Sequence, residues 1–272
     1  MANSPLRWAG SKRSLMSNIR AAWPTEVDHY FEPFMGSACV FFDAGPTSAS
    51  LSDFNYELVQ FFHELQSNVE ALATAFAELD PLGGDFYNVR AQRGEALTPA
   101  DRAARFLYLN RFAFNGVYRT NRAGQFNVPQ GKRTGALPSS SELLEASRQL
   151  SGTSIRCLDW REALEPATAG DFIYLDPPYR NDTRPTFGEY GYGAFGSAKD
   201  VQLLAAELKR LDSLGARVLL SFNDDHELGD TLEGWHIERI ERRRSVAGKS
   251  GSRTTLRGEI LARNYRQEAK VA

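Results

Sequence analysis

The chain has 272 residues, of which 42% are hydrophobic and 24% are charged, and its formal net charge at pH 7 is −2. This composition is typical of a soluble globular protein and excludes a disordered or fibrous chain. No apolar run comes near the roughly 18 to 20 residues that cross a bilayer, so no membrane partner is expected.

The cysteines, histidines and first residues narrow the class further. Cys39 and Cys157 give no disulfide framework, which fits a reducing cytoplasm. The four histidines lie far apart without metal-ligand spacing, so no metal site is expected. The start MANSPLRWAGSKR lacks the hydrophobic stretch of a signal peptide, and a cytoplasmic location is therefore expected.

Two strands and a long helix are predicted in the first third of the chain. The strands cover residues 29–32 and 49–52, and each ends near a carboxylate or a glycine-containing turn. Apolar residues at helical spacing predict one long helix over residues 57–79, which the PLGG of 81–84 ends.

The middle of the chain is predicted to be basic and mainly helical. Residues 100–112 have a helical pattern, and FNGVYRTNRAGQFNVPQGKR (114–133) combines glycine and asparagine with alternating apolar residues, which predicts a basic hairpin or loop. Residues 101–133 hold seven basic residues against one acid, and residues 238–266 hold nine against three, so each segment carries +6. Phosphate binding depends on such local charge, so a nucleic-acid partner stays open beside two merely solvated basic faces.

Strands and helices alternate again in the last part of the chain. The predicted elements are a helix over 141–150, strands at 154–158 and 171–175, a helix over 199–214, a strand at 216–221, and two strands within 236–265. Alternation at both ends of the chain, around a helical middle, predicts an α/β protein. It consists of a parallel-sheet domain with an insertion and an antiparallel strand pair at one edge.

Two strand ends carry the pattern of a nucleoside site. YFEPFMGSACVFF (30–42) is a strand, an acid and a Gly/Ser turn, and LSDFN (51–55) ends the next strand in Asp53. Small residues let the backbone approach a ligand, and such a carboxylate accepts hydrogen bonds from ribose hydroxyls. Plainer interpretations stay open, in which Gly36 only makes a turn and Asp53 only caps a helix. The pattern is not GxGxxG, so a nicotinamide cofactor is not favoured, and the GKS of 248–250 is no phosphate loop.

The stretch DFIYLDPPYR (171–180) places an acid, two prolines and an aromatic ring at the end of a buried strand. Asp176 and the Pro177 carbonyl form a rigid pair of acceptors, and the Tyr179 ring offers a surface on which a planar group stacks. Acceptors aimed at an exocyclic amine hold its lone pair out of conjugation and stabilise the positive charge that develops when the nitrogen is alkylated. The strand end is therefore predicted to hold an aromatic amine.

Six stretches, in this order along the chain, resemble the Dam-type DNA adenine-N6 methyltransferases, which use S-adenosylmethionine. They are PLRWAGSKR (5–13), YFEPFMGSACVFF (30–42), LSDFN (51–55), FLYLNRFAFNGVYRTNRAGQFNVPQG (106–131), DFIYLDPPY (171–179) and RRSVAGKSGSRTTLRGEILARNY (243–265). The resemblance implies a Rossmann-like methyltransferase domain with a mostly parallel seven-stranded sheet over residues 1–56 and 154–272. It also implies an inserted, mainly helical DNA-binding domain with a basic hairpin over residues 57–153.

By position, the resemblance also implies cofactor-binding and catalytic residues. The family's cofactor-binding residues fall on Trp8, Lys12, Asp53 and Asp176, and Glu32 and Phe34 are expected to line the same pocket, which completes the cofactor-binding set. For Glu32, a role as a brace behind the pocket stays open. The catalytic set consists of Asp176, Pro177 and Tyr179. Lys12 is expected to be the partner of the cofactor's methionine carboxylate.

The predicted DNA-binding residues lie in the middle segment. The resemblance matches Val117, Arg119 and Pro129 to positions that meet DNA, and the rest of the set consists of Arg111, Asn115, Arg122, Lys132 and Arg133. Arg119 is the candidate for a bidentate contact with a guanine edge, which specifies sequence. The candidates for phosphate contacts, which position the duplex without specifying sequence, are Arg111, Arg122, Lys132 and Arg133.

The chain departs from the family pattern at three places. Ser11 replaces a glycine of the usual WAGGK, and Ala38 takes a glycine position in FMGSAC. Alanine adopts only a negative φ without strain, so the approach of the cofactor is expected to differ there in detail. Residues 221–225 read SFNDD where an SNHD-like stretch is usual, near the expected target-base pocket, which argues against assuming the same DNA specificity.

The expected reaction takes place on duplex DNA bound between the sheet domain and the basic insertion. The target adenine is flipped out, its N6 donates to Asp176 and to the Pro177 carbonyl, and the nitrogen attacks the sulfonium methyl in line. This chemistry needs no nucleophilic cysteine.

Two other functions stay open at this point. One is methyl transfer to an RNA or to a protein amide, and the other is a DNA-binding module whose enzyme site has decayed. GATC is the family's best-known target, but other recognition sequences stay open, as do a solitary, a phage or a restriction-linked role with an endonuclease partner. A single chain that holds both a cofactor domain and a DNA reader favours a monomer.

Overall fold

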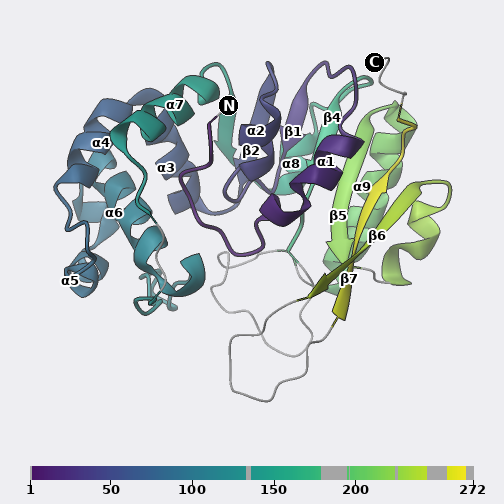
Figure 1. Cartoon of the computed structure of the whole chain (residues 1–272). Helices are drawn as coiled ribbons and strands as arrows, with labels where there is room; N and C mark the ends of the chain where they lie inside the picture. Colours follow the sequence, from purple (N-terminus) through teal and green to yellow (C-terminus); the bar gives the residue numbers. More distant parts are fainter. Residues whose placement is uncertain are drawn as a thin grey trace.

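The computed structural model describes residues 2–132, 136–178, 195, 197–223, 226–243 and 256–267. A seven-stranded sheet runs through it in the order β3-β2-β1-β4-β5-β7-β6 (Figure 1). The strands are β1 (Tyr30–Glu32), β2 (Ala49–Asp53), β3 (Ser154–Cys157), β4 (Phe172–Leu175), β5 (Arg217–Asn223), β6 (His236–Arg243) and β7 (Leu256–Arg263). Strands β1 to β5 pair in parallel, and β7 runs antiparallel between β5 and β6. The predicted α/β class with a mostly parallel seven-stranded sheet is confirmed, as is the antiparallel pair at one edge.

The sheet lies between two helical layers because its central strands are apolar on both sides. In β4 all four residues are buried: Phe172 and Tyr174 face one hydrophobic cluster, and Ile173 and Leu175 face the other. A parallel strand covered on both faces needs such a continuous apolar run. The helices are α1 (Met16–Ala22), α2 (Cys39–Ala44), α3 (Tyr56–Ser67), α4 (Val69–Ala77), α5 (Phe86–Ala91), α6 (Pro99–Phe112), α7 (Ser140–Leu150), α8 (Trp160–Leu164) and α9 (Ala198–Leu214). Short 3-10 turns lie at Lys12–Leu15, Gly94–Ala96, Phe114–Gly116 and His226–Leu232.

Residues 57–79 form two helices, and the prediction of one long helix is wrong. Helix α3 ends at Ser67, Asn68 has φ −145° and ψ 40°, and α4 begins at Val69. Phe62 of α3 and Leu72 of α4 both pack into the same cluster, so the apolar spacing continues across the break. Hydrophobic periodicity therefore cannot reveal it. The other predicted helices and strands agree with the structure to within two residues at their ends.

Helices α3 to α7 pack together at the β3 end of the sheet (Figure 1). Phe61 of α3 stacks on Phe106 of α6 with their ring centroids 5.6 Å apart, and Phe62 of α3 lies 6.4 Å from Phe42 of α2. These rings belong to the cluster that also covers one face of the sheet. The described parts of residues 57–153, which were predicted as an inserted domain, thus pack on the same core as the sheet.

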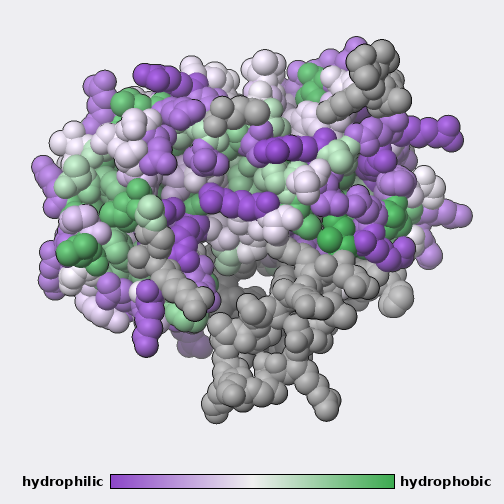
Figure 2. Space-filling model, viewed as in Figure 1, coloured by the Kyte–Doolittle hydropathy of each residue, from purple (hydrophilic) through white to green (hydrophobic). Residues whose placement is uncertain are grey.

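The described surface is mostly hydrophilic in the view of Figure 2, where hydrophobic residues form scattered groups rather than one continuous patch. Among the described residues, no helix is both long enough and apolar enough to cross a membrane. This side of the protein therefore presents polar and charged groups rather than a large apolar surface.

Candidate active site

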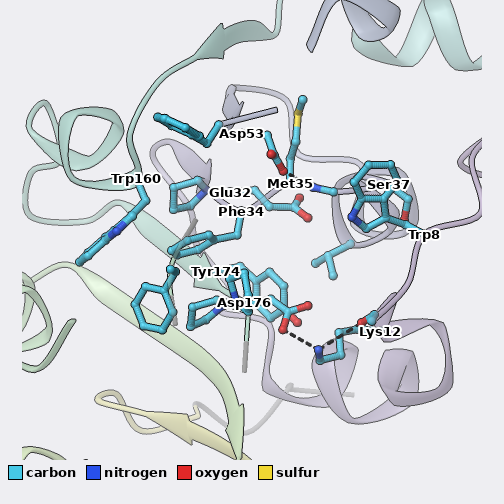
Figure 3. A pocket seen from close by; sticks show the side chains of 18 of the residues that line it. Trp8, Lys12, Glu32, Phe34, Met35, Ser37, Asp53, Trp160, Tyr174 and Asp176 are labelled. Atoms are coloured by element: carbon cyan, nitrogen blue, oxygen red, sulfur yellow. Dashed lines mark hydrogen bonds and ion pairs between the residues drawn. The ribbon is translucent and has the colours of Figure 1, made fainter. Parts of the chain in front are cut away.

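A pocket lies at the carboxyl edge of the parallel strands, where open α/β sheets bind their ligands (Figure 3). The turns after β1, β2, β3 and β4 line it, and residues 8–12 of the N-terminal segment close one side. Every residue of the predicted cofactor-binding set lines this pocket: Trp8, Lys12, Glu32, Phe34, Asp53 and Asp176. Pro177 lines it too. Residues spread over 170 positions of sequence are thus brought together by the sheet.

Lys12 and Asp176 form a buried ion pair at the tip of β4. The Lys12 ammonium lies 2.5 Å from Asp176 Oδ1 and donates to the Gly10 carbonyl at 3.2 Å. It also lies 3.4 Å from Glu259 Oε1, which accepts a hydrogen bond from Ser221 Oγ at 3.0 Å. The side chain of Lys12 is 3% exposed and that of Asp176 is 19% exposed, so water screens this pair weakly.

Glu32, at the end of β1, is a second buried acid of the pocket. Its Oε2 accepts hydrogen bonds from the Tyr30 hydroxyl at 2.8 Å and from the Phe41 N–H at 3.2 Å. Burial raises the pKa of Glu32 to about 8, and the nearby Asp176 carboxylate raises it too, against these hydrogen bonds. The carboxyl group points into the space between Asp53 and Asp176 (Figure 3).

Asp53, at the end of β2, is held by the backbone of two turns. It accepts the Gly36 N–H at 3.1 Å and the Asn55 N–H at 2.9 Å. Burial raises the pKa of Asp53 to about 6, although both hydrogen bonds lower it. The carboxylate that sequence reasoning assigned to a nucleoside site therefore lines the pocket and fixes the turn after β1 at the same time. It caps no helix, because Asn55 is the residue that caps α3.

The turn after β1 lies directly under Trp8. Gly36 has φ +46°, and a Cβ there would lie 2.8 Å from Trp8 Cδ1, so only glycine allows this approach. Two residues on, Ala38 has φ 52° and ψ 31°, the left-handed conformation that alanine was expected to avoid. The alanine therefore keeps the shape a glycine would give, at a cost of about 1–2 kcal/mol in backbone strain.

An aromatic wall closes the opposite side of the pocket. Phe34 stacks on Trp160 with centroids 5.8 Å apart, and Phe195 meets Phe34 edge-on at 5.9 Å. Trp160 follows β3 and was not among the predicted site residues. The signal that could have found it is its place just after the next parallel strand, because all such strand ends meet at one edge.

The predicted basic hairpin forms a loop closed by antiparallel backbone pairs. Ala113 pairs with Gln130, and Thr120 pairs with Phe126. The loop brings together five of the predicted DNA-binding residues: Asn115, Val117, Arg119, Arg122 and Pro129. Asn115 is exposed in a left-handed conformation with φ 54°, and the neighbouring Phe114 ring is 47% exposed. An exposed large aromatic ring in such a loop was missed by sequence reasoning, since exposure cannot be read from composition.

The arginines of the basic segment have different surroundings. Arg119 Nε donates to Asn127 Oδ1 at 2.7 Å and is half-buried, whereas Arg122 and Lys132 are exposed. Arg111 is half-buried and donates to the Pro5 carbonyl at 3.1 Å, and burial lowers the pKa of its guanidinium, as do Arg7 and Arg13 nearby.

Two further arginines of this segment bind other groups of the protein. Arg102 is paired with Glu57, and Arg105 donates to the carbonyls of Val89 and Arg90, each at 3.0 Å. Their charge is therefore engaged within the protein. Only part of the +6 counted from the sequence is thus available at the surface.

The loop is fastened to the segment that closes the pocket. Asn110 of α6 accepts the Arg7 N–H at 2.8 Å and donates to the Arg7 carbonyl at 2.5 Å. Next to this pair, Trp8 stacks on Tyr118 of the loop with centroids 6.1 Å apart. The ring that lies over the pocket thus also contacts the loop that carries the DNA-binding candidates.

Other features bear on the predicted chemistry. Tyr179 and Arg133 lie outside the described residues, as do residues 224–225 of the SFNDD stretch. Burial raises the pKa of the thiols of Cys39 and Cys157, which makes both poor nucleophiles near neutral pH. Within the described part of the chain, no group of three His, Cys, Asp or Glu residues could hold a metal ion.

Comparisons with known proteins agree with the geometry. A family model described as D12 class N6 adenine-specific DNA methyltransferase matches residues 8–246. The type II methyltransferase M1.LlaDCHI of Lactococcus lactis subsp. cremoris is 33% identical over 269 residues, covering 95% of this chain and 94% of that protein. A DNA adenine methylase of Haemophilus influenzae is 30% identical over 266 residues, covering 94% and 92%. A DNA N-6-adenine-methyltransferase of Escherichia phage P1 is 33% identical over 265 residues, which are 92% of this chain and 34% of that protein.

Proposed function

Since the chain belongs to the D12 class of N6 adenine-specific DNA methyltransferases, we propose that it transfers a methyl group from S-adenosylmethionine to adenine N6 at one short site in duplex DNA. The observation that carries this proposal is the position of Asp176 and Pro177. Both line the pocket at the tip of β4, with the carboxylate held by a buried lysine. An acceptor pair at this strand end can accept both hydrogens of an exocyclic amine that enters the pocket.

The pocket's chemistry fits S-adenosylmethionine. The carboxyl groups of Glu32, Asp53 and Asp176 and the ammonium group of Lys12 all line the pocket (Figure 3). Burial raises the pKa of Glu32 and of Asp53, so a ligand with a positive charge and with hydroxyl donors would stabilise both carboxylates. When bound, S-adenosylmethionine supplies an electrophilic methyl group on a positively charged sulfur.

We assign roles to the pocket's residues on this basis. Asp53 accepts the ribose hydroxyls, and Trp8 and Phe34 enclose apolar parts of the cofactor. Lys12 is proposed to meet the methionine carboxylate. An ammonium has three N–H donors, and Asp176, Glu259 and the Gly10 carbonyl all lie within 3.4 Å of it. Lys12 must therefore exchange one of these acceptors when the carboxylate enters.

The DNA side of the reaction begins with the loop of residues 113–130. Arg119 is proposed to read a guanine edge, with its Nε held by Asn127, while Arg122 and Lys132 meet phosphates. Flipping the target adenine costs a few kcal/mol of lost stacking and pairing. The exposed Phe114 ring supports the proposal because an apolar wedge can fill part of the space that the base leaves. Asn115, Val117 and Pro129 sit on the same loop and complete the proposed contact surface.

The flipped base is proposed to meet Asp176 and Pro177. The carboxylate and the Pro177 carbonyl accept the two N6 hydrogens, which turns the nitrogen lone pair away from the ring. As N6 gains positive charge, the Asp176 carboxylate stabilises it. One of its oxygens is the first acceptor for the proton that N6 then loses. Tyr179 is proposed to stack on the base.

The acceptor is tested by supplying methyl-labelled S-adenosylmethionine with duplex DNA, RNA or a protein mixture. We expect label in DNA alone, on adenine N6, and loss of labelling in the Asp176→Ala variant with DNA affinity unchanged within about threefold. Label in RNA or protein would replace the DNA acceptor, and an Asp176→Ala variant with most of the wild-type rate would refute the catalytic assignment. The single chain's oligomeric state is measured in the same preparation, where we expect a monomer.

A further inference from the structure

Glu259 is a buried acid that the proposed reaction does not yet use. Its side chain is 5% exposed, it lies 3.4 Å from the Lys12 ammonium, and it accepts a hydrogen bond from Ser221. We propose that Glu259 is a positioning residue for methyl transfer, which holds the Lys12 ammonium in place and thereby sets the orientation of the Asp176 carboxylate. This inference rests on the proposed function.

The sheet's antiparallel edge brings Glu259 to the pocket. Glu259 lies on β7 opposite Asn223, the last residue of β5. Because β7 runs antiparallel to β5, a residue in its first half comes level with the carboxyl edge of the parallel strands. The acid thus reaches Lys12 from the side opposite to β1, and it does so from a rigid strand rather than from a loop.

Lys12 needs a second anion because its first partner, Asp176, is also proposed to accept the target amine. A buried ammonium is strongly disfavoured unless it is paired and hydrogen-bonded. When Asp176 accepts the target amine, its interaction with Lys12 weakens. The cofactor's carboxylate, which Lys12 is also proposed to meet, then attracts the ammonium away from Asp176, and Glu259 holds it in place from strand β7.

The charges of the cluster point the same way. The described charged groups around Lys12 are two carboxylates, Asp176 and Glu259, and Glu32 lies near enough to Asp176 for each to affect the other. Among the described residues, two carboxylates thus flank one ammonium. A carboxylate fixed beside the target amine favours the positive charge that forms on N6 in the transition state and has little effect on the neutral base in the ground state.

Replacing Glu259 by glutamine separates its charge from its packing. Glutamine has nearly the same size and still accepts from Ser221, but it carries no charge. We expect E259Q to lower kcat at least about tenfold at saturating cofactor and DNA, with both KM values within about threefold of wild type and with a native-like Tm. E259D, which restores the charge with a shorter reach, is expected to recover part of the lost rate.

The matched control is E238Q on β6, the neighbouring strand of the same edge. Glu238 accepts a hydrogen bond from Asn18 at 2.6 Å, and it has no part in the proposed site. We expect E238Q to keep the wild-type kcat. The inference is overturned if E259Q retains kcat within twofold of wild type. It is also overturned if E259D has as low a kcat as E259Q, since restoring the negative charge would then not restore the rate. Should the wild-type protein itself fail to methylate DNA, the proposed function fails first, which these variants do not address.

Discussion

Replacing Gly36 by alanine tests how closely the turn after β1 holds Trp8 over the pocket. The left-handed φ of +46° costs an L residue about 1–2 kcal/mol, partly offset by about 0.4–1 kcal/mol from the less flexible unfolded chain. A Cβ at this position would also lie 2.8 Å from Trp8 Cδ1 and 3.0 Å from Nε1. Because the indole is held from behind by Tyr118, moving it adds about 1–3 kcal/mol. We expect G36A to lower the free energy of unfolding by about 2–4 kcal/mol.

A glycine that also has a positive φ but has open space where a Cβ would lie provides the control. Gly152 has φ +77°, and a Cβ there would have nothing within 4 Å, so G152A carries the backbone cost alone, about 1 kcal/mol. Urea unfolding of both variants measures the difference, and titration calorimetry measures S-adenosylmethionine binding. We expect G36A to weaken cofactor binding at least about tenfold and G152A to leave it unchanged. Equal stability losses and equal cofactor affinities would refute the argument that Trp8 is held against this turn.

Further substitutions at Glu32, Arg119, Arg122 and Phe114 follow from the structure. Burial raises the pKa of Glu32 from its ordinary value of 4.5 to about 8, so the folded protein favours the protonated acid, and stability falls as pH rises through this window by up to about 4 kcal/mol. Urea unfolding at pH 5 and at pH 8 gives the change in the free energy of unfolding between these two pH values, and this change is expected to be much smaller in E32Q than in the wild type. An equal change in the variant and the wild type would contradict the assignment. R119A is expected to lower the discrimination between bases at one base pair of the site by about 1–3 kcal/mol, measured on substrates with single base changes. R122A is expected to weaken binding to all DNA sequences alike, and the salt dependence of its binding should correspond to about one phosphate contact fewer. F114A is expected to keep the wild-type Tm and to slow methylation of a fully paired duplex more than of a duplex whose target adenine is mismatched, because opening a mismatch costs less; equal slowing on both substrates would argue against a wedge.

The sheet could be predicted from sequence because its strands are short apolar runs that end in polar residues. Asp53 and Asp176 both follow such runs, so their meeting at one edge follows from the parallel order alone. The break at Asn68 could not be predicted, since α3 and α4 turn their apolar residues to one cluster. Helices α1, α2, α5 and α8 have seven residues or fewer, which is too short for a helical period to stand out.

The site was predictable where a residue type stands at a strand end, and not where a partner comes from elsewhere. Glu259 lies on the antiparallel strand β7, and only the register of β7 against β5 brings it to Lys12. The left-handed conformation of Ala38 was also beyond sequence reasoning, because propensity argues against it. Surrounding packing decides that position, with the methyl group fully buried in the core.

The central claim is that the pocket methylates adenine N6 in DNA, with Asp176 at its centre. The most direct measurement expresses the wild-type chain and the Asp176→Ala variant in a host that lacks N6-methyladenine, and then maps modified bases in the genomic DNA by single-molecule sequencing. The account predicts N6-methyladenine within one short motif for the wild type and none for the variant. Unmodified DNA from the wild type, together with measured binding of S-adenosylmethionine by the purified protein, would contradict it.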